Sequence, residues 1–118
     1  IILLAPCPEA LSSQPEHVST MEALLGIPSR SLFHETQRQG LDDYAALCVS
    51  DIAARSTELG WVTVVSSGLT EDELAVVGLD RADSVEEALE RAFKRQGDEA
   101  SIVVLTHGGE TLPVLDEA

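Results

Sequence analysis

Two periods of apolar residues alternate along the chain. Short apolar runs rich in β-branched residues lie at 1–5, 61–65 and 101–105, and each indicates a strand. The longer segments between them repeat apolar residues every three or four positions, which is typical of helices with one buried face. This alternation predicts an α/β fold, with a small, mainly parallel sheet of three or four strands and helices on its faces.

The predicted strands differ in how deeply they are expected to lie in the sheet. The run Ile1–Ala5 is continuous and stops at Pro6, so we expect a strand buried on both faces. Residues 61–65 form the second strand and residues 101–105 the third. Leu112–Val114 contains Pro113, which is tolerated at the edge of a sheet, so we expect a short edge strand there.

Three pairs of residues have the spacing of a capping box, in which a Ser or Thr and a Glu three positions later satisfy the first amides of a helix. These pairs predict that helices begin at Ser19, Thr70 and Ser84. A further helix is expected over 29–39, with Leu32 and Phe33 turned inward.

The longest predicted helix begins after Asp42 or Asp43 and runs to about Glu58. Its apolar residues recur at the spacing of one helical face, which we expect to be buried. The residues of this face are Ala45, Cys48, Val49, Ile52 and Ala53. In the helix from Ser84, the residues expected to be buried are Val85, Ala88, Leu89, Ala92 and Phe93.

Composition restricts the classes of function. The 118 residues suit one domain, and the formal net charge of −14 disfavours nucleic acid and anionic membrane surfaces as partners. No apolar run approaches the roughly 20 residues of a membrane span. Two cysteines without a disulfide framework suggest free thiols and a cytoplasmic location. Because the chain opens on a strand-like run without Met, we expect a fragment of a longer protein, which the resemblance described below implies has two domains.

In an open parallel sheet, ligands bind at the loops that follow the strands, here residues 6–9, 66–70 and 106–110. His107-Gly108-Gly109 could bring backbone amides and an imidazole to a ligand, although a simple turn is the favoured interpretation. Cys7 could be a nucleophile, but the neighbouring Glu9 disfavours a thiolate.

The remaining polar candidates favour structural roles. Cys48 lies on the predicted apolar helix face and is expected in the core, and core packing is also favoured for Trp61. His17 and His34 show no ligand spacing and are expected at the surface. No residue of the chain is therefore assigned as catalytic or as a metal ligand.

Taken together, several segments resemble the C-terminal domain of the nickel-dependent lactate racemase family. The segments that carry the resemblance are the opening IILLAPCPEA, the strand at Val62–Ser66, the stretch Ser84–Glu90 and the run His107–Val114. The resemblance covers the whole chain, so residues 1–118 are interpreted as a single domain that closes the active-site cleft of a longer protein.

The resemblance implies a cytoplasmic racemase or epimerase of 2-hydroxy acids. Its N-terminal catalytic domain, the implied partner, would hold a nickel-pincer nucleotide and the catalytic histidines. Asp42-Asp43-Tyr44 is similar to the motif that supplies a cleft-facing aromatic, so Tyr44 is the one site residue carried over, as a contact near the cofactor. Glu9 and Ala10 stand where relatives usually carry glycines, so the resemblance does not define which 2-hydroxy acid is used.

Two other interpretations of the chain stay open at this point. One is a self-contained α/β module that binds a ligand at Gly108-Gly109, for which a large exposed apolar patch would be unfavourable. The other is a thiol enzyme centred on Cys7.

Overall fold

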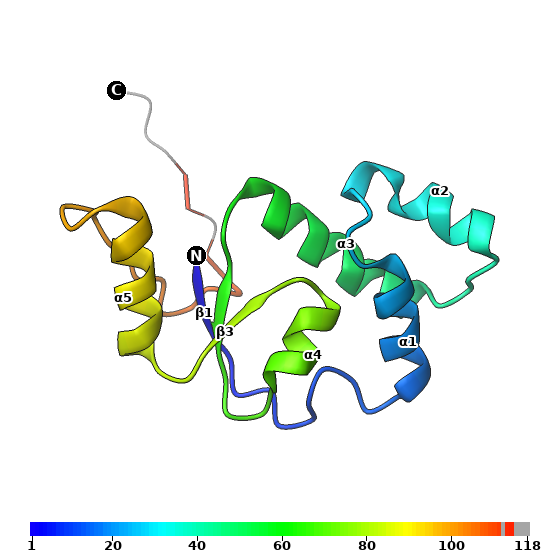
Figure 1. Ribbon diagram of the computed structural model, residues 1–118, viewed down its shortest axis with the longest axis horizontal. Helices are drawn as coiled ribbons and strands as arrows, with labels where there is room; N and C mark the ends of the chain where they lie inside the picture. The colour runs from blue at the N-terminus through cyan, green and yellow to red at the C-terminus, as the bar shows by residue number, and fades with distance from the viewer. Residues whose placement is uncertain (112, 115–118) are drawn as a thin grey trace.

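The computed structural model describes residues 1–111 and 113–114 and confirms the α/β class. Three strands form one parallel sheet in the order β1-β2-β3: β1 (Ile2–Leu4), β2 (Thr63–Val65) and β3 (Asp80–Ala82). The sheet lies at the centre of Figure 1, with α1–α3 gathered at one end and α5 at the other. The helices are α1 (Pro15–Leu24), α2 (Ser29–Gln39), α3 (Tyr44–Leu59), α4 (Glu71–Val76) and α5 (Val85–Gln96).

Two strands differ from the prediction. β1 forms as expected, but it is an edge strand with Leu3 49% and Leu4 61% exposed, so the prediction of burial on both faces was wrong. β3 was not predicted, because Asp80-Arg81-Ala82 carries no β-branched residue. Its pairing with β2, and not its own propensity, makes it a strand.

The caps of α4 and α5 follow the sequence closely. The Thr70 hydroxyl accepts from the Glu73 amide, and the Glu73 carboxylate accepts from the Thr70 amide, which completes the predicted capping box. Ser84 likewise caps α5 by accepting from the Glu87 amide. The Glu87 carboxylate accepts from the Asp83 amide, one residue earlier than predicted.

The start of α1 was predicted wrongly. The helix begins at Pro15, whose fixed φ and missing N–H suit the first helical turn. Ser19 therefore lies inside the helix, where its hydroxyl donates to the Pro15 carbonyl. In α2 the bounds are as expected, and Gly40 follows the helix with a left-handed φ of 69°. Leu32 is buried as predicted, but Phe33 is 59% exposed and Thr36 is the other buried residue of the helix.

α3 has the predicted bounds, with Asp43 as its cap, but it buries a different face. Its buried residues are Ala46, Leu47, Ser50 and Ala53. Three of these side chains are small, which lets α1 and α2 pack closely against the helix. Of the face predicted to be buried only Ala53 is in the core, and Cys48 is exposed.

The last predicted strands are absent from the described part of the chain. Residues 101–105 are extended but lie outside the sheet, with Val103 80% and Val104 77% exposed. Of the predicted edge strand at 112–114, Leu112 lies outside the described residues, and Pro113 and Val114 are not in a strand. In α5, Ala88 is buried as predicted, whereas Val85 is exposed.

The core consists of three small clusters and gives an elongated molecule. One joins Met21 of α1 to Ala46 and Ala53 of α3, a second joins Leu24, Leu32 and Leu47, and a third lies under the sheet at Val64, Leu69 and Leu74. The Cα radius of gyration is 15.7 Å, whereas a closed domain of this length would have about 13.5 Å. The chain thus encloses less of its apolar surface than its length allows.

Candidate functional site

Two of the three predicted ligand loops meet at the carboxyl edge of the sheet. The Ser66 hydroxyl donates to the Pro6 carbonyl over 3.3 Å and accepts from the Gly68 amide over 3.2 Å. A Cβ at Gly68 would lie 2.0 Å from the Cys7 carbonyl oxygen, so only glycine fits this contact. Cys7 itself has a φ of 41°, a value unusual for a residue with a side chain. The loops after β1 and β2 are therefore fixed against each other.

The third loop stands apart from this edge. Thr106–Glu110 forms a turn in which the Glu110 amide donates to the His107 carbonyl over 2.9 Å. The Thr106 hydroxyl lies 3.1 Å from His107 Nδ1, so the imidazole contacts its own neighbour. His107 and Cys7 are not brought together, and neither has the arrangement of a nucleophile and its base.

Tyr44 opens α3 and is 66% exposed. Directly before it, Asp43 caps the helix by accepting from the Ala46 amide over 3.0 Å, and its other oxygen lies 2.5 Å from His17 Nδ1. The Ala46 amide, helped by His17, lowers the pKa of the Asp43 carboxyl below its usual 3.8. His17 was expected at the surface, and its contact with Asp43 was not predicted, because no local spacing links two residues 26 positions apart. This contact ties α1 to the start of α3, where Tyr44 lies.

From Tyr44 an apolar surface runs along α3. We call this surface the α3 outer face and define it by Tyr44, Ala45, Cys48, Val49 and Ile52, all of which are exposed. Ile52 is 66% and Val49 40% exposed. Tyr44, Cys48 and Ile52 are four positions apart, and so are the adjacent Ala45 and Val49, so all five residues share one side of the helix. The periodicity identified an apolar face correctly, but nothing in the described structure covers it.

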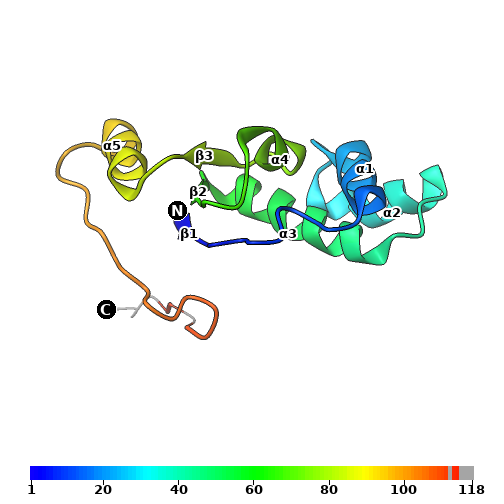
Figure 2. The same cartoon turned by 90° about the horizontal axis from the view of Figure 1, so that it is seen from below.

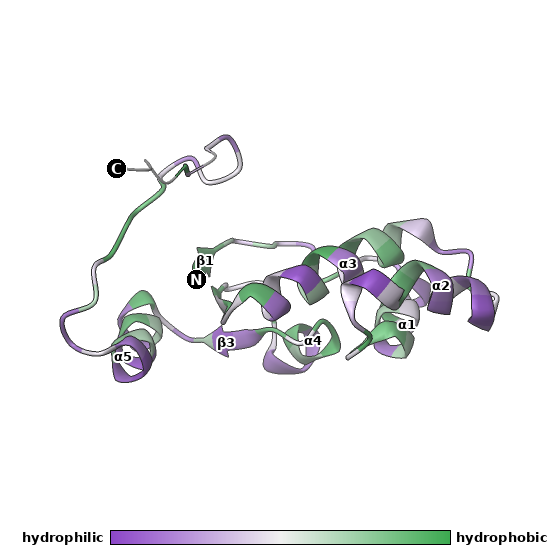
Figure 3. Ribbon diagram, turned by 90° about the horizontal axis from the view of Figure 1, so that it is seen from above, coloured by the Kyte–Doolittle hydropathy of each residue, from purple (hydrophilic) through white to green (hydrophobic). Residues whose placement is uncertain are grey.

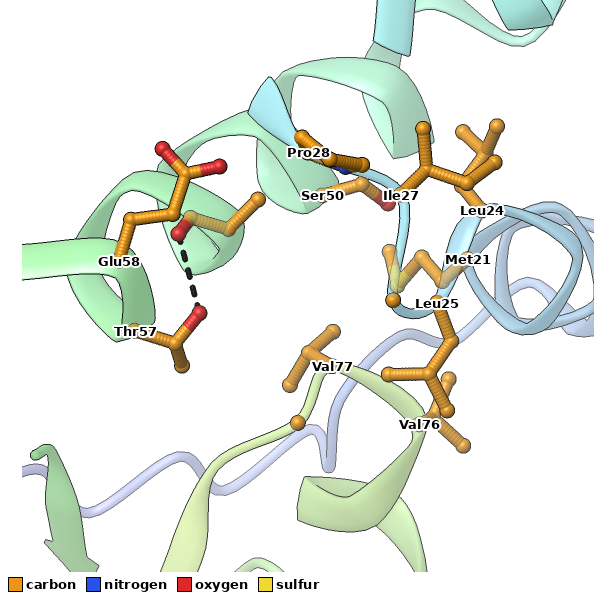
Figure 4. Close-up of a pocket in the computed structure, with 13 residues that line it drawn as sticks. Met21, Leu24, Leu25, Ile27, Pro28, Ser50, Thr57, Glu58, Val76 and Val77 are labelled. Atoms are coloured by element: carbon orange, nitrogen blue, oxygen red, sulfur yellow. Dashed lines mark hydrogen bonds between the residues drawn. The ribbon is translucent and has the colours of Figure 1, made fainter. Parts of the chain in front are cut away.

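A shallow pocket lies on the other side of α3, between that helix, α1 and the end of α4 (Figure 4). Met21, Ile27 and Val77 supply apolar walls, and Ser50 lines the pocket with a buried hydroxyl that has no hydrogen-bond partner among the described residues. At the rim, the Glu58 carboxylate accepts from the amide and the hydroxyl of Ser29, over 2.8 and 2.9 Å. These two bonds lower the pKa of Glu58, the amide more than the hydroxyl. Because the Glu58 carboxylate is already bonded to Ser29 at the start of α2, Ser50 is the main polar group that the pocket offers for hydrogen bonding to a ligand.

The cations of the chain are largely occupied. Six of the seven basic residues make ion pairs with carboxylates. They are Arg38, Arg55, Arg81, Arg91, Lys94 and Arg95. With a net charge of −14, the chain alone is poorly suited to bind a carboxylate substrate.

Trp61 is 55% exposed, so the expected core position was wrong. The Arg95 guanidinium lies over its ring, 2.8 Å from the centroid, and also lies 3.7 Å from the Asp80 carboxylate. The indole therefore holds the end of α5 to the residues that lead into β2, through a cation–π contact.

The described part of the chain contains no group of three or more His, Cys, Asp or Glu residues that could hold a metal ion. No helix within residues 1–111 is long and apolar enough to cross a membrane. Comparisons with family models, with curated proteins and with solved structures found no match to the chain.

Proposed function

We propose that the chain is the C-terminal closing domain of a cytoplasmic nickel-pincer racemase or epimerase that acts on 2-hydroxy acids. In this account the nickel-pincer nucleotide and the catalytic groups belong to an N-terminal domain, and this chain covers the cleft. The observation that supports the proposal is the uncovered α3 outer face, which begins at Tyr44.

The α3 outer face has the chemistry of an interface between domains. A contiguous exposed apolar patch on a helix marks a contact surface more often than a free surface. Burial of Ile52 and Val49 against another domain would stabilise docking by roughly 1.5–3 kcal/mol for each fully covered side chain, before entropic costs. A self-contained module has no use for such a face, so its exposure weighs against that alternative.

Tyr44 connects this surface to the cleft. The resemblance assigns it as the cleft-facing aromatic, and its position at the first turn of α3 puts it at one end of the α3 outer face. Docking of the face would bring the phenol to the border between the domains, where an aromatic side chain with one polar end can exclude water and still contact a polar substrate.

The electrostatics suit a closing role rather than a catalytic one. The carboxylate of a 2-hydroxy acid needs cationic partners, and the cations of this chain are mostly paired with its own acids. Recognition of the substrate charge would therefore fall to the N-terminal domain. This chain would contribute closure, orientation and exclusion of water.

The test uses the protein encoded by the complete reading frame that contains this chain. We expect it to interconvert the enantiomers of a 2-hydroxy acid, measured by chiral chromatography, and to contain nickel by metal analysis. Ile52→Lys should lower kcat/KM by about tenfold or more, because it puts a charge into the interface. Gln96→Lys, which makes the same change of charge at an exposed position of α5, should leave kcat/KM unchanged. A full-length protein without nickel and without racemase activity would rule out the proposal.

A further inference from the structure

The outer edge of β1 is free for pairing. The Thr63 amide donates to the Ile1 carbonyl over 2.9 Å, and the Ala5 amide donates to the Val65 carbonyl over 3.2 Å. Residues 1 and 5 therefore point their backbone groups toward β2. Because backbone groups of successive strand residues point to opposite edges, those of Ile2 and Leu4 point away from β2, where the described residues place no strand.

A second unpaired segment has strand composition. In Ser101–Leu105 three β-branched residues stand between the serine and the leucine. These residues, Ile102, Val103 and Val104, are 54–80% exposed. Exposed extended segments of this kind pair readily with open sheet edges. Figure 3 shows the apolar residues of β1 and of this segment on the same side of the molecule.

The position of α5 determines which edge the chain returns to. Connections between parallel strands are right-handed. When successive strands are added at the same edge of a sheet, their connecting helices therefore lie on one face. A connection that returns to the opposite edge uses the other face. α4 connects β2 to β3 and packs on β3, whereas α5 packs on β2 and β3 from the opposite face (Figure 2). α5 is therefore on the correct face to lead the chain back across the sheet toward β1.

The path after α5 agrees with this direction. Only Gly97–Ala100 separates α5 from Ser101, a length typical of loops that lead from a helix into a parallel strand. In Figures 2 and 3 the extended segment lies beyond the β1 edge and far from β3. The described structure thus leaves a free edge and an unpaired strand-like segment on the same side of the sheet.

We propose that residues 101–105 add to the free edge of β1 as a fourth parallel strand, which gives the order β3-β2-β1-β4. The docked segment would satisfy the backbone groups of Ile2 and Leu4 and would cover apolar side chains of β1. It would also bring the 106–110 turn beside the loop after β1, at the point where the strand order reverses. Open α/β sheets bind ligands at such a point. The inference rests on the fold and does not depend on the racemase assignment.

Amide hydrogen exchange of the whole 118-residue chain tests this inference, with the Leu4 amide as the probe. The docked strand should slow exchange at Leu4 by about 100-fold relative to an unstructured peptide. The Ala5 amide, which already bonds β2, is the internal reference. Successive strand residues point to opposite edges, so one of the two variants Ile102→Pro and Val103→Pro removes a backbone donor that faces β1 and should return Leu4 to fast exchange. Val103→Ala keeps the donor and should preserve most of the protection.

Three results would overturn the inference. The first is fast exchange at Leu4 in the unmodified chain, and the second is unchanged protection in both Ile102→Pro and Val103→Pro. The third is protection that appears only in a dimer, detected by light scattering at several concentrations, which would assign the edge to a second copy.

Discussion

At the scale of single residues, a few polar side chains fix where the helices begin. The Ser84 hydroxyl accepts from the Glu87 amide over 3.1 Å and satisfies one of the first amides of α5. Ser84→Ala should lower the free energy of unfolding by about 1 kcal/mol, the usual loss for a missing cap. Chemical denaturation measures the change, with the exposed Ser67→Ala as control. Equal stability of the two variants would show that the cap contributes nothing.

Asp43 makes the stability depend on pH in the acid range. The Ala46 amide, helped by His17, lowers its pKa below 3.8 in the folded chain. A group with a lowered folded pKa stabilises the fold above its unfolded pKa, and this contribution is lost as the pH falls through the folded value. The contribution should therefore disappear below about pH 4.

Asp43→Asn keeps a capping oxygen but removes the titration. Its free energy of unfolding should fall less steeply between pH 4 and pH 2 than that of the unmodified chain, as measured by denaturation at each pH. Parallel pH profiles of the two proteins would contradict the role of this carboxylate.

At the scale of elements, α3 has two apolar sides, and packing selects between them. The periodicity of the sequence favoured the side that contains Val49 and Ile52, but the small residues Ala46, Ser50 and Ala53 allow α1 and α2 a closer approach. Ile52→Lys should therefore change the unfolding free energy of the isolated chain by only about 0.5 kcal/mol. Leu47→Ala, on the buried side, should cost about 2–5 kcal/mol. The reverse ranking in denaturant titrations would contradict the orientation of the helix.

The elements that the sequence predicted well are those determined by local chemistry. The capping box at Thr70 and Glu73 depends on residues three positions apart and was predicted correctly, as were the bounds of α2. β3 escaped prediction because its pairing with β2 comes from tertiary structure. Residues 101–105 were predicted as a strand from their apolar run, but such a run does not determine pairing, and in the described structure these residues lie outside the sheet.

The candidate site shows the same division. Tyr44 was selected from the sequence through the resemblance alone, and its exposure at the first turn of α3 was not predicted. The loops after the first two strands were predicted as ligand loops, but the contact of Ser66 with Pro6 that joins them was not. The pairing of His17 with Asp43 could not be predicted, because it joins two helices that only the tertiary fold brings together. The burial of Cys48 was predicted wrongly, since period alone does not tell which apolar side of a helix finds a partner.

At the scale of the whole molecule, the chain has its own core but leaves apolar surface uncovered at α3 and at β1. Its radius of gyration exceeds that of a closed domain of the same length. We expect the proposed catalytic domain to cover the α3 outer face.

The alkylation rate of Cys48 reports whether the α3 outer face is covered, because the thiol lies on this face and is exposed in the 118-residue chain. The measurement compares the 118-residue chain with the full-length protein, both carrying Cys7→Ser, with peptide mass spectrometry to identify the modified site. We expect alkylation of Cys48 to be about tenfold or more slower in the full-length protein, because the docked domain would exclude the reagent. Equal rates in the two proteins would contradict docking at this face and, with it, the proposed closing role.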